Sequence, residues 1–212
     1  MNSSVPSVAQ CLEFMERYRM LDNIRAHSLQ VARVAIILTD GLEEAGRAVE
    51  LPRKDMVLAG ALLHDIAKTR CLKENCRHDV EGEAICIELG YPEIGEIVRE
   101  HVTLRNFAVQ NYIKGIFGPK EIVYYADKRV RHDEIVSLDS RLAYILKRYG
   151  NGEPEREKLI RKNFSKCHEL EHYLFAFLDF PPDQVANRVQ KKTFDFSPAW
   201  TGKQSMTKQC GK

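Results

Sequence analysis

Histidine and aspartate residues occupy positions that the sequence otherwise predicts to be buried, apolar faces of helices. The clearest case is His64-Asp65, which continues the apolar run 57–63. A buried carboxylate is unfavourable unless a cation or several hydrogen-bond donors contact it. Four predicted helices carry such residues: His27, His64-Asp65, His101 and Asp127. Because imidazole and carboxylate groups are ligands for divalent metals, the pattern predicts that these side chains converge on a bound cation.

Each of these residues also has a simpler explanation when it is considered alone. A single histidine in a core is usually a packing residue, and a single aspartate at a helix end is usually a cap. The His-Asp dipeptide is weak evidence by itself, because His78-Asp79 and His132-Asp133 repeat it in polar surroundings. The hypothesis of a metal site therefore depends on the recurrence across separate helices.

Helical periodicity of apolar residues runs through most of the chain. In the predicted helix 23–45, apolar residues recur at steps of three and four, and Asn23 is the expected N-cap. Further helices are predicted at 53–70, at 79–89, from Pro92 to 101, from Pro119 onward, and at about 138–149, 154–179 and 183–192. No alternating segment predicts a strand. The expected fold class is all-α.

One domain is predicted over residues 8–190, with the candidate ligands in about 20–150. Residues 103–118 form the longest internal stretch without a predicted element. Long internal loops often carry function, so we expect this stretch and the region after 150 to determine the substrate. The segment 193–212 is polar, and we expect a mobile or weakly docked tail there.

The overall charge is nearly balanced. The 212 residues include 32 Lys and Arg and 30 Asp and Glu, a formal net charge of +2. This balance excludes a strongly basic nucleic-acid-binding protein, so an anionic ligand requires a local cluster. No apolar run approaches the ~20 residues of a membrane-spanning helix, and no signal peptide is recognisable. The six cysteines lack the spacing of a disulfide framework, which predicts a cytoplasmic protein with reduced thiols.

The order of the candidate ligands resembles a known family signature. His27, His64-Asp65 and Asp127 are similar to the H…HD…D signature of the HD-domain superfamily of metal-dependent phosphohydrolases. The string Leu-His-Asp-Ile-Ala-Lys at 63–68 resembles that family's HDIGK form, with alanine where glycine is common. The family therefore becomes the leading interpretation of the sequence.

The resemblance implies an HD-domain helical bundle with divalent metal ions, two in number, between its helices. His78, which precedes Gly82 by four residues, and His101 match the two additional histidines of binuclear members. The implied ligands are His27, His64, Asp65 and Asp127 for one metal, and the bridging Asp65 with His78 and His101 for the other. A single metal with His78 or His101 merely nearby stays an alternative. The implied metal is Fe, Mn, Co, Ni, Zn or Mg.

The resemblance also implies hydrolysis of a small-molecule phosphomonoester or nucleotide. Two divalent metals about 3.5–4 Å apart can activate a bridging water as hydroxide and neutralise phosphoryl oxygens. Lys68 lies three residues after Asp65, and we expect it to contact the substrate phosphate. Asp65 and Lys68 are therefore the expected catalytic residues. Arg105 and Arg131 each follow a candidate ligand by four residues and could extend a positive rim for the substrate; the alternative for all three basic residues is a solvated surface charge.

Two other functions stay open at this level. A minority of HD-domain proteins use the same six ligands in a diiron oxygenase, and a non-catalytic nucleotide-binding module could keep the site for stability. Two other candidate metal sites are weaker. Cys71-x₄-Cys76-x-His78 lacks a fourth ligand, and His168-x₃-His172 is flanked by glutamates. No glycine-rich nucleotide loop or nucleic-acid-binding motif is recognisable, and the sequence does not indicate the oligomeric state.

Overall fold

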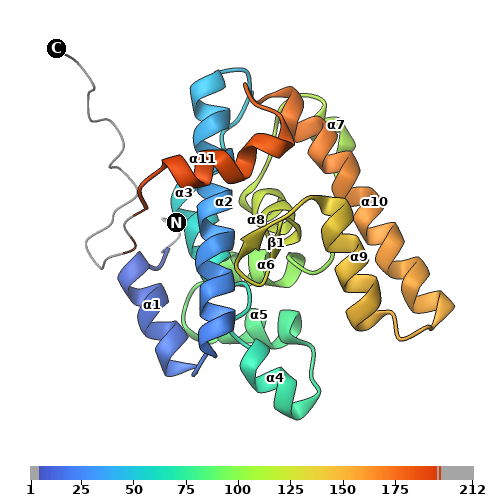
Figure 1. Ribbon diagram of the computed structural model, residues 1–212. Coiled ribbons are helices and arrows are strands. Elements are labelled where there is room, and N and C mark those ends of the chain that lie inside the picture. Colours follow the sequence, from blue (N-terminus) through green and yellow to red (C-terminus); the bar gives the residue numbers. More distant parts are fainter. Residues whose placement is uncertain (1–4, 195, 197–212) are drawn as a thin grey trace.

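Helices dominate the computed structural model, which describes residues 5–194 and 196 (Figure 1). The predicted all-α fold class is thereby confirmed. The helices are α1 (Val8–Arg17), α2 (Asp22–Ala45), α3 (Lys54–Leu63), α4 (Lys68–Glu74), α5 (His78–Glu88), α6 (Pro92–Glu100), α7 (Val109–Tyr112), α8 (Pro119–Lys128), α9 (Leu138–Tyr149), α10 (Pro154–Ala176) and α11 (Val185–Lys191), with a 3₁₀ helix at Pro182–Gln184. No helix among the described residues is long and apolar enough to cross a membrane.

The predicted tail, 193–212, lies mostly outside the described residues. Of the part that is described, the rings of Phe194 and Phe196 stack on each other and pack against the core. The stretch 103–118, which has no predicted element, contains the short helix α7. Tyr112 and Phe117 from this stretch are buried and stack with their rings nearly parallel.

The start of α2 differs from the prediction. Asn23 is not the N-cap; the helix begins at Asp22 after Leu21, and no side chain caps it. The Leu21 N–H instead donates a hydrogen bond to the Thr69 hydroxyl of α4 at 3.0 Å. A tertiary contact therefore satisfies this backbone group, and such contacts are not visible in a local sequence signal.

The predicted single helix 53–70 is wrong, because the chain turns between α3 and α4. The turn is tightened by hydrogen bonds from the Ile66 N–H to the Leu63 carbonyl and from the Lys68 N–H to the Asp65 carbonyl, both of 3₁₀ type. An apolar run alone does not show this break, since residues on both sides of the turn are buried. The break places the His64-Asp65 pair in the turn itself.

One small hairpin is present where no strand was expected. β1 (Val130–Arg131) pairs antiparallel with β2 (Glu134–Ile135), directly after α8. Strands of two residues are too short to show an alternating pattern, which explains why the sequence gives no signal. At the turn of the hairpin, His132 adopts a positive φ of 57°.

A disulfide bond joins Cys71 and Cys76, so the expectation of reduced thiols is wrong for this pair. After α4 the chain reverses at Asn75, which has a positive φ of 51°, and this brings the two cysteines together. The bond also rules out the zinc site considered for these cysteines, because both sulfur atoms are already bonded. Among the other described cysteines, Cys11, Cys86 and Cys167 are free and buried.

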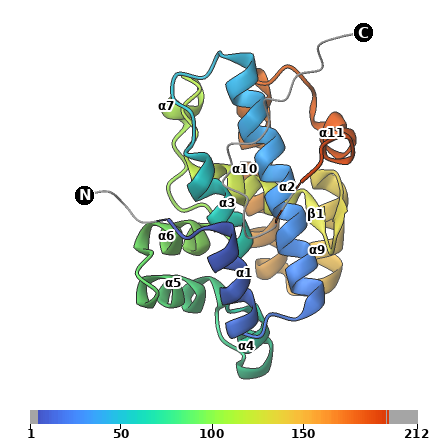
Figure 2. The ribbon, with the colours of Figure 1, turned by 90° about the vertical axis from the view of Figure 1, so that its left-hand side faces the viewer.

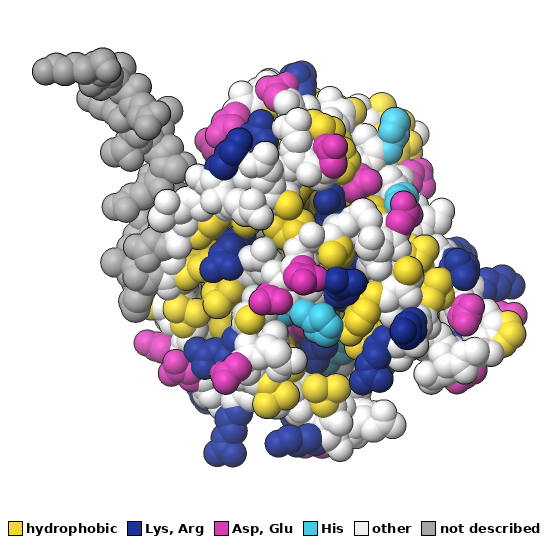
Figure 3. All heavy atoms as spheres, viewed as in Figure 1, with side chains coloured by type: hydrophobic (Ala, Val, Ile, Leu, Met, Phe, Trp, Pro, Cys, Tyr) yellow, Lys and Arg dark blue, Asp and Glu magenta, His cyan; other side chains and the backbone are white. Residues whose placement is uncertain are grey.

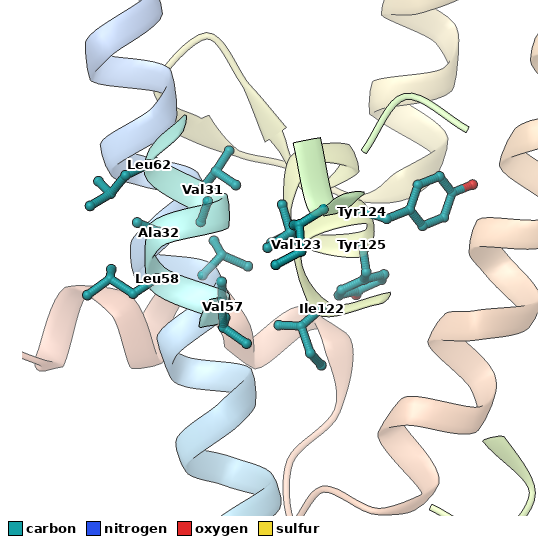
Figure 4. Close-up of a cluster of buried hydrophobic side chains, with 14 of the residues drawn as sticks. Val31, Ala32, Val57, Leu58, Leu62, Ile122, Val123, Tyr124 and Tyr125 are labelled. Atoms are coloured by element: carbon teal, nitrogen blue, oxygen red, sulfur yellow. The ribbon is translucent and has the colours of Figure 1, made fainter. Parts of the chain in front are cut away.

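Helices α2, α3 and α8 form the centre of the molecule and pack on one another. Helices α5 and α6 pack as a pair (Figure 2). Helix α6 also contacts α3 and α8. Helices α9 and α10 form another pair, which reaches the centre through the contact of α10 with α8. Figure 4 shows the apolar side chains that meet at the centre: Val31 and Ala32 of α2, Val57, Leu58 and Leu62 of α3, and Ile122, Val123, Tyr124 and Tyr125 of α8.

The surface carries charges of both signs. On the face shown in Figure 3, Lys and Arg side chains are interspersed with Asp and Glu side chains and with apolar patches. This distribution agrees with the formal net charge of +2. A positive field for an anionic ligand must therefore come from a few residues at one site.

Candidate metal centre

The structure brings all six predicted ligand residues together from five separate segments. His27 is the sixth residue of α2, and Asp127 lies in the last turn of α8. His64 and Asp65 lie in the turn after α3. His78 is the first residue of α5, and His101 follows α6. Five of the six are at most 8% exposed: His27, His64, Asp65, His101 and Asp127. His78 is partly exposed.

The first group of donor atoms surrounds one side of Asp65. Asp65 Oδ2 lies 3.4 Å from His64 Nε2 and 4.0 Å from His27 Nε2. Asp127 Oδ1 lies 3.0 Å from His27 Nε2 and 3.7 Å from His64 Nε2. His27, His64 and Asp65 are close enough together to hold one metal ion. Asp127 of α8 lies beside the two imidazoles of this set.

The second group uses the other oxygen of the same carboxylate. Asp65 Oδ1 lies 3.4 Å from His78 Nε2 and 3.6 Å from His101 Nε2. The two Nε2 atoms lie 3.3 Å from each other. These three residues form a second set that could hold a metal ion, and Asp65 is common to both sets.

Backbone carbonyls fix the orientation of three of the imidazole rings. The Nδ1 atoms of His64 and His101 lie 2.7 Å and 2.5 Å from the carbonyl oxygens three residues earlier in the chain, at Ala61 and Val98. His27 Nδ1 lies 2.8 Å from the carbonyl oxygen of a β1–β2 hairpin residue, His132. If each Nδ1–H donates to its carbonyl, each Nε2 carries the lone pair that faces the cluster, which is the arrangement of a metal ligand.

Two polar atoms of the cluster have no hydrogen-bond partner, although they are buried. They are His64 Nε2 and Asp65 Oδ1. Buried polar atoms without partners are rare, so each requires an explanation. A cation held between the imidazole and carboxylate donors would satisfy both atoms. The donor set of nitrogen and oxygen atoms therefore fits a divalent metal ion such as Fe, Mn, Co, Ni or Zn.

The pKa values of three of these residues, Asp65, Asp127 and His78, suit metal binding. Burial raises the pKa of Asp65, but Lys68 and His64 outweigh it, and the net pKa lies well below the usual range. The pKa of Asp127 is likewise lowered, because Lys128 and His27 outweigh its burial. Burial lowers the pKa of His78 to about 4. At neutral pH the carboxylates are therefore charged and this imidazole is neutral, as ligands must be.

Two lysines hold the carboxylates in place. Lys68 Nζ lies 2.7 Å from Asp65 Oδ2 and takes part in the lining of the adjacent cavity. Lys128 Nζ lies 2.8 Å from Asp127 Oδ2 and donates a hydrogen bond to the His101 carbonyl at 2.7 Å. Lys128 is only 6% exposed, and the sequence analysis did not single it out. Its signal was present, because it directly follows Asp127 at the end of the apolar run 122–126.

The two predicted rim arginines are not brought to the cluster. Arg105 pairs with Glu100, to which both its backbone N–H and its Nε donate. Arg131 pairs with Glu134 within the hairpin at 2.6 Å. Neither residue lines the cavity beside the cluster. Both guanidinium groups therefore already have carboxylate partners.

The pair His168 and His172 does not form a metal site among the described residues. His168 lies 3.3 Å from Asp139 through its Nε2, and its side chain is 41% exposed. Of the described residues, only the two sets that share Asp65 bring three ligand atoms close together. The structure therefore fits the simpler interpretation, in which the two histidines lie on the solvent side of α10.

A cavity of about 460 Å³ opens beside the second set of donors. His78, His101 and Asp127 line one of its sides, together with Lys68 and Lys128. Helices α9 and α10 supply the opposite side. One basic residue in this lining, Arg141 of α9, was missed by the sequence analysis, since nothing in the sequence relates it to the ligands.

The helical bundle and its His/Asp cluster define a protein of the metal-binding HD type. Comparison with known protein families matches the HD domain to residues 24–131, more than half of the chain and the range that contains all six clustered residues. The chain belongs to the HD-domain family, whose members are typically metal-dependent phosphohydrolases. A search of curated proteins and a search of solved structures each returned no match.

Proposed function

We propose that the protein is a metal-dependent phosphohydrolase that hydrolyses a small phosphomonoester or nucleotide. The observation that carries this proposal is the sharing of Asp65 between two sets of buried donors at the edge of a cavity. His64 Nε2 and Asp65 Oδ1, which lack hydrogen-bond partners, support the presence of cations there. The three basic side chains of the cavity suit an anionic substrate.

In this proposal the six residues hold two divalent metals. His27, His64, Asp65 and Asp127 hold one, and Asp65, His78 and His101 hold the other. Two such metals supply an activated water and neutralise the charge that develops on the phosphoryl oxygens. The backbone carbonyls behind His27, His64 and His101 keep their Nε2 atoms directed at the centre, so that this part of the donor geometry is formed before a metal binds.

Lys68 has the role of binding the substrate phosphate. Its ammonium group contacts Asp65 Oδ2 and lines the cavity, so it lies at the boundary between the cluster and the substrate. The pKa of Lys68 is raised, because Asp65 and Asp127 outweigh the effect of burial, and the group is therefore charged at neutral pH. Lys128 acts as a positioning residue, since it holds Asp127 and the His101 carbonyl. Arg105 and Arg131 are not part of the proposal, because neither lines the cavity.

The proposal is tested with protein that is purified without chelator, analysed for metal and loaded with Mn²⁺. Release of inorganic phosphate from a panel of phosphomonoesters under argon is the expected result. The absence of release from every ester by fully metallated protein would contradict the proposal. Consumption of O₂ by iron-loaded protein, without phosphate release, would instead support the diiron oxygenase.

A variant of Lys68 tests its role separately. Lys68→Ala should raise KM for the ester about tenfold, the value expected for the loss of one charge-assisted contact, while the metal content stays close to two equivalents. Lys73→Ala is the matched control, because Lys73 is exposed on the same helix and does not line the cavity. Unchanged KM in Lys68→Ala would remove this residue from substrate binding.

A further inference from the structure

The cavity beside the cluster has two chemically different sides. The donor residues and Lys68 line the side toward the metal centre. The opposite side is built by the two helices that follow the matched HD-domain region, α9 and α10, and is mostly apolar apart from Arg141 and Asn163. Its apolar side chains are Ile145 and Tyr149 of α9 and Leu159, Ile160 and Phe164 of α10. This division indicates a ligand with an anionic end and an apolar end.

Arg141 is the buried cation on the α9 side of this cavity. The residue is 8% exposed, and its Nε is buried without a hydrogen-bond partner. Its guanidinium group lies over the Tyr144 ring, with Cζ 5.5 Å from the ring centroid, and forms no ion pair with a described residue. A buried charge without an anion is strongly unfavourable, so an anionic group of a ligand is the partner that this site lacks.

The apolar side continues outward to the mouth of the cavity. Leu72 of α4 and Leu159 of α10 are each 67% exposed, and Tyr149 of α9 is 48% exposed. These three residues come from three different helices, and all of them line the same cavity. Exposed large apolar residues that converge on one groove are typical of a binding surface. The ligand therefore reaches from the metal centre to this apolar mouth.

Few neutral polar groups of the lining are available to form hydrogen bonds with the organic part of a ligand. Asn163 lies in the lining, but its Nδ2 donates to the Val102 carbonyl at 2.9 Å, and its Oδ1 accepts from the Tyr124 hydroxyl at 2.9 Å. The hydroxyl groups of Thr103 and Tyr149 remain. Recognition of the organic part therefore depends on apolar contact rather than on a pattern of hydrogen bonds.

We propose that Arg141 binds an anionic oxygen of the substrate and that the α9–α10 side selects phosphomonoesters with a large apolar or aromatic alcohol. The proposal rests on the phosphohydrolase function proposed above. In this proposal, residues other than the six metal ligands select the substrate. Esters of small hydrophilic alcohols are therefore expected to be poor substrates.

The substrate class is tested with two esters of different alcohols. With Mn²⁺-loaded protein, kcat/KM for 1-naphthyl phosphate should exceed that for glycerol 2-phosphate at least tenfold. Binding is measured independently by calorimetry with two compounds that cannot be hydrolysed, 1-naphthylmethylphosphonate and methylphosphonate, and the same order of affinity is expected. Equal or reversed preference in the calorimetry would overturn the proposal. If neither ester is hydrolysed, the panel of phosphomonoesters described above decides the proposed function, while the calorimetry still decides the preference.

Arg141→Gln tests the anion-binding residue. It should weaken the binding of both phosphonates about 10- to 100-fold and leave their ratio unchanged, because the lost contact is to the anionic end. Arg141→Lys, which keeps the charge, should recover part of that loss. Lys147→Gln is the matched control, since Lys147 is an exposed cation on the same helix outside the cavity. Unchanged phosphonate affinity in folded Arg141→Gln protein would exclude Arg141 from the site, and an affinity of Arg141→Lys no better than that of Arg141→Gln would exclude a role for its charge.

Leu159→Asn tests the apolar side without disturbing the core, because Leu159 is exposed. The preference for the naphthyl compounds should fall several-fold, while the affinity for methylphosphonate stays constant. Ile113→Asn is the control, because Ile113 is 54% exposed and does not line the cavity. An unchanged ratio in Leu159→Asn would show that the apolar mouth does not select the substrate.

Discussion

Asp65 is the one residue whose two oxygens face different sets of donors. Oδ2 faces His64 and His27, and Oδ1 faces His78 and His101. The sequence predicts this residue and four of its neighbours in the cluster, because each continues or ends an apolar helical face, whereas His78 is predicted only through the resemblance to the HD-domain family. It could not predict Arg141, since an arginine in an amphipathic helix is ordinary and only the tertiary structure shows that its Nε has no partner.

Substitution of Asp65 and of Asp127 distinguishes a carboxylate that belongs to both donor sets from one that belongs to a single set. Asp65→Asn should lower the metal affinity of both sites at least tenfold, since even the partners of metal ligands commonly contribute that much. Asp127→Asn should affect one site only. Metal content by mass spectrometry after dialysis measures the difference. Asp133→Asn, in the exposed His132-Asp133 pair, is the control. If Asp65→Asn and Asp127→Asn each lost only one equivalent of metal, the result would contradict the proposal that Asp65 serves both sites.

At the scale of elements, the close approach of α5 and α6 sets the position of His78. A Cβ at Gly82 would lie 2.6 Å from Val98 Cγ1 of α6 and 3.6 Å from Ile66 of the turn that carries Asp65. Only a residue without a side chain therefore fits between α5 and its neighbours. Sequence analysis noted Gly82 through the resemblance alone, and the structure supplies this packing reason.

Gly82→Ala should destabilise the fold and move α5 away from α6. The expected loss is about 1–3 kcal/mol in the free energy of unfolding, as for other overpacked sites. Val98→Ala removes the overlapping methyl group, so the double variant should lose less than the sum of the two single losses. Urea denaturation measures all three values. Strictly additive losses would show that the contact with Val98 does not limit this position.

Glu121 at the start of α8 provides a test that depends on pH. Burial raises the pKa of this carboxyl, although hydrogen bonds from the Gly118 N–H and the Tyr112 hydroxyl oppose the shift. A folded-state pKa above the unfolded value means that this group supports stability most below its unfolded pKa. That contribution is lost as the pH rises through the folded pKa.

Glu121→Gln removes this titration. The free energy of unfolding of the variant, relative to the parent protein, should therefore increase as the pH rises from 4 to 7. Chelator is present in both samples, so that the metal ligands contribute equally to the two proteins. Denaturation curves at several pH values give the difference directly. A relative stability that decreases with pH would mean that the carboxylate form is the favoured one in the folded state.

At the scale of the whole molecule, the proposed metals connect segments that are 100 residues apart in sequence. His27 of α2 and Asp127 of α8 approach within 3.0 Å, and α5 contributes His78 to the same cluster. A ligand that binds only the folded protein stabilises it by mass action. Without the cations, two carboxylates and four imidazoles share one buried space.

Metal removal should consequently lower the thermal stability. At a free metal concentration of about 100 times Kd, binding contributes about 2.7 kcal/mol per site, which corresponds to about 5–10 °C in Tm for a chain of this size. Calorimetric melting with chelator and with added Mn²⁺ measures the shift. In Asp65→Asn the shift should be nearly abolished. An equal shift in that variant would place the stabilising metal elsewhere.

The sequence by itself determined the fold class and the six residues that cluster. Helical periodicity and its interruption by histidine and aspartate are local patterns that indicate five of them, and the resemblance to the HD-domain family adds His78. The tertiary structure decided the rest: the turn between α3 and α4, the Cys71–Cys76 bond, the partners of Arg105 and Arg131, and the cavity that α9 and α10 complete. The reason is physical. Whether a charged side chain has a partner, and whether an apolar one meets solvent or another helix, depends on residues that are distant in the chain, and only packing brings them together.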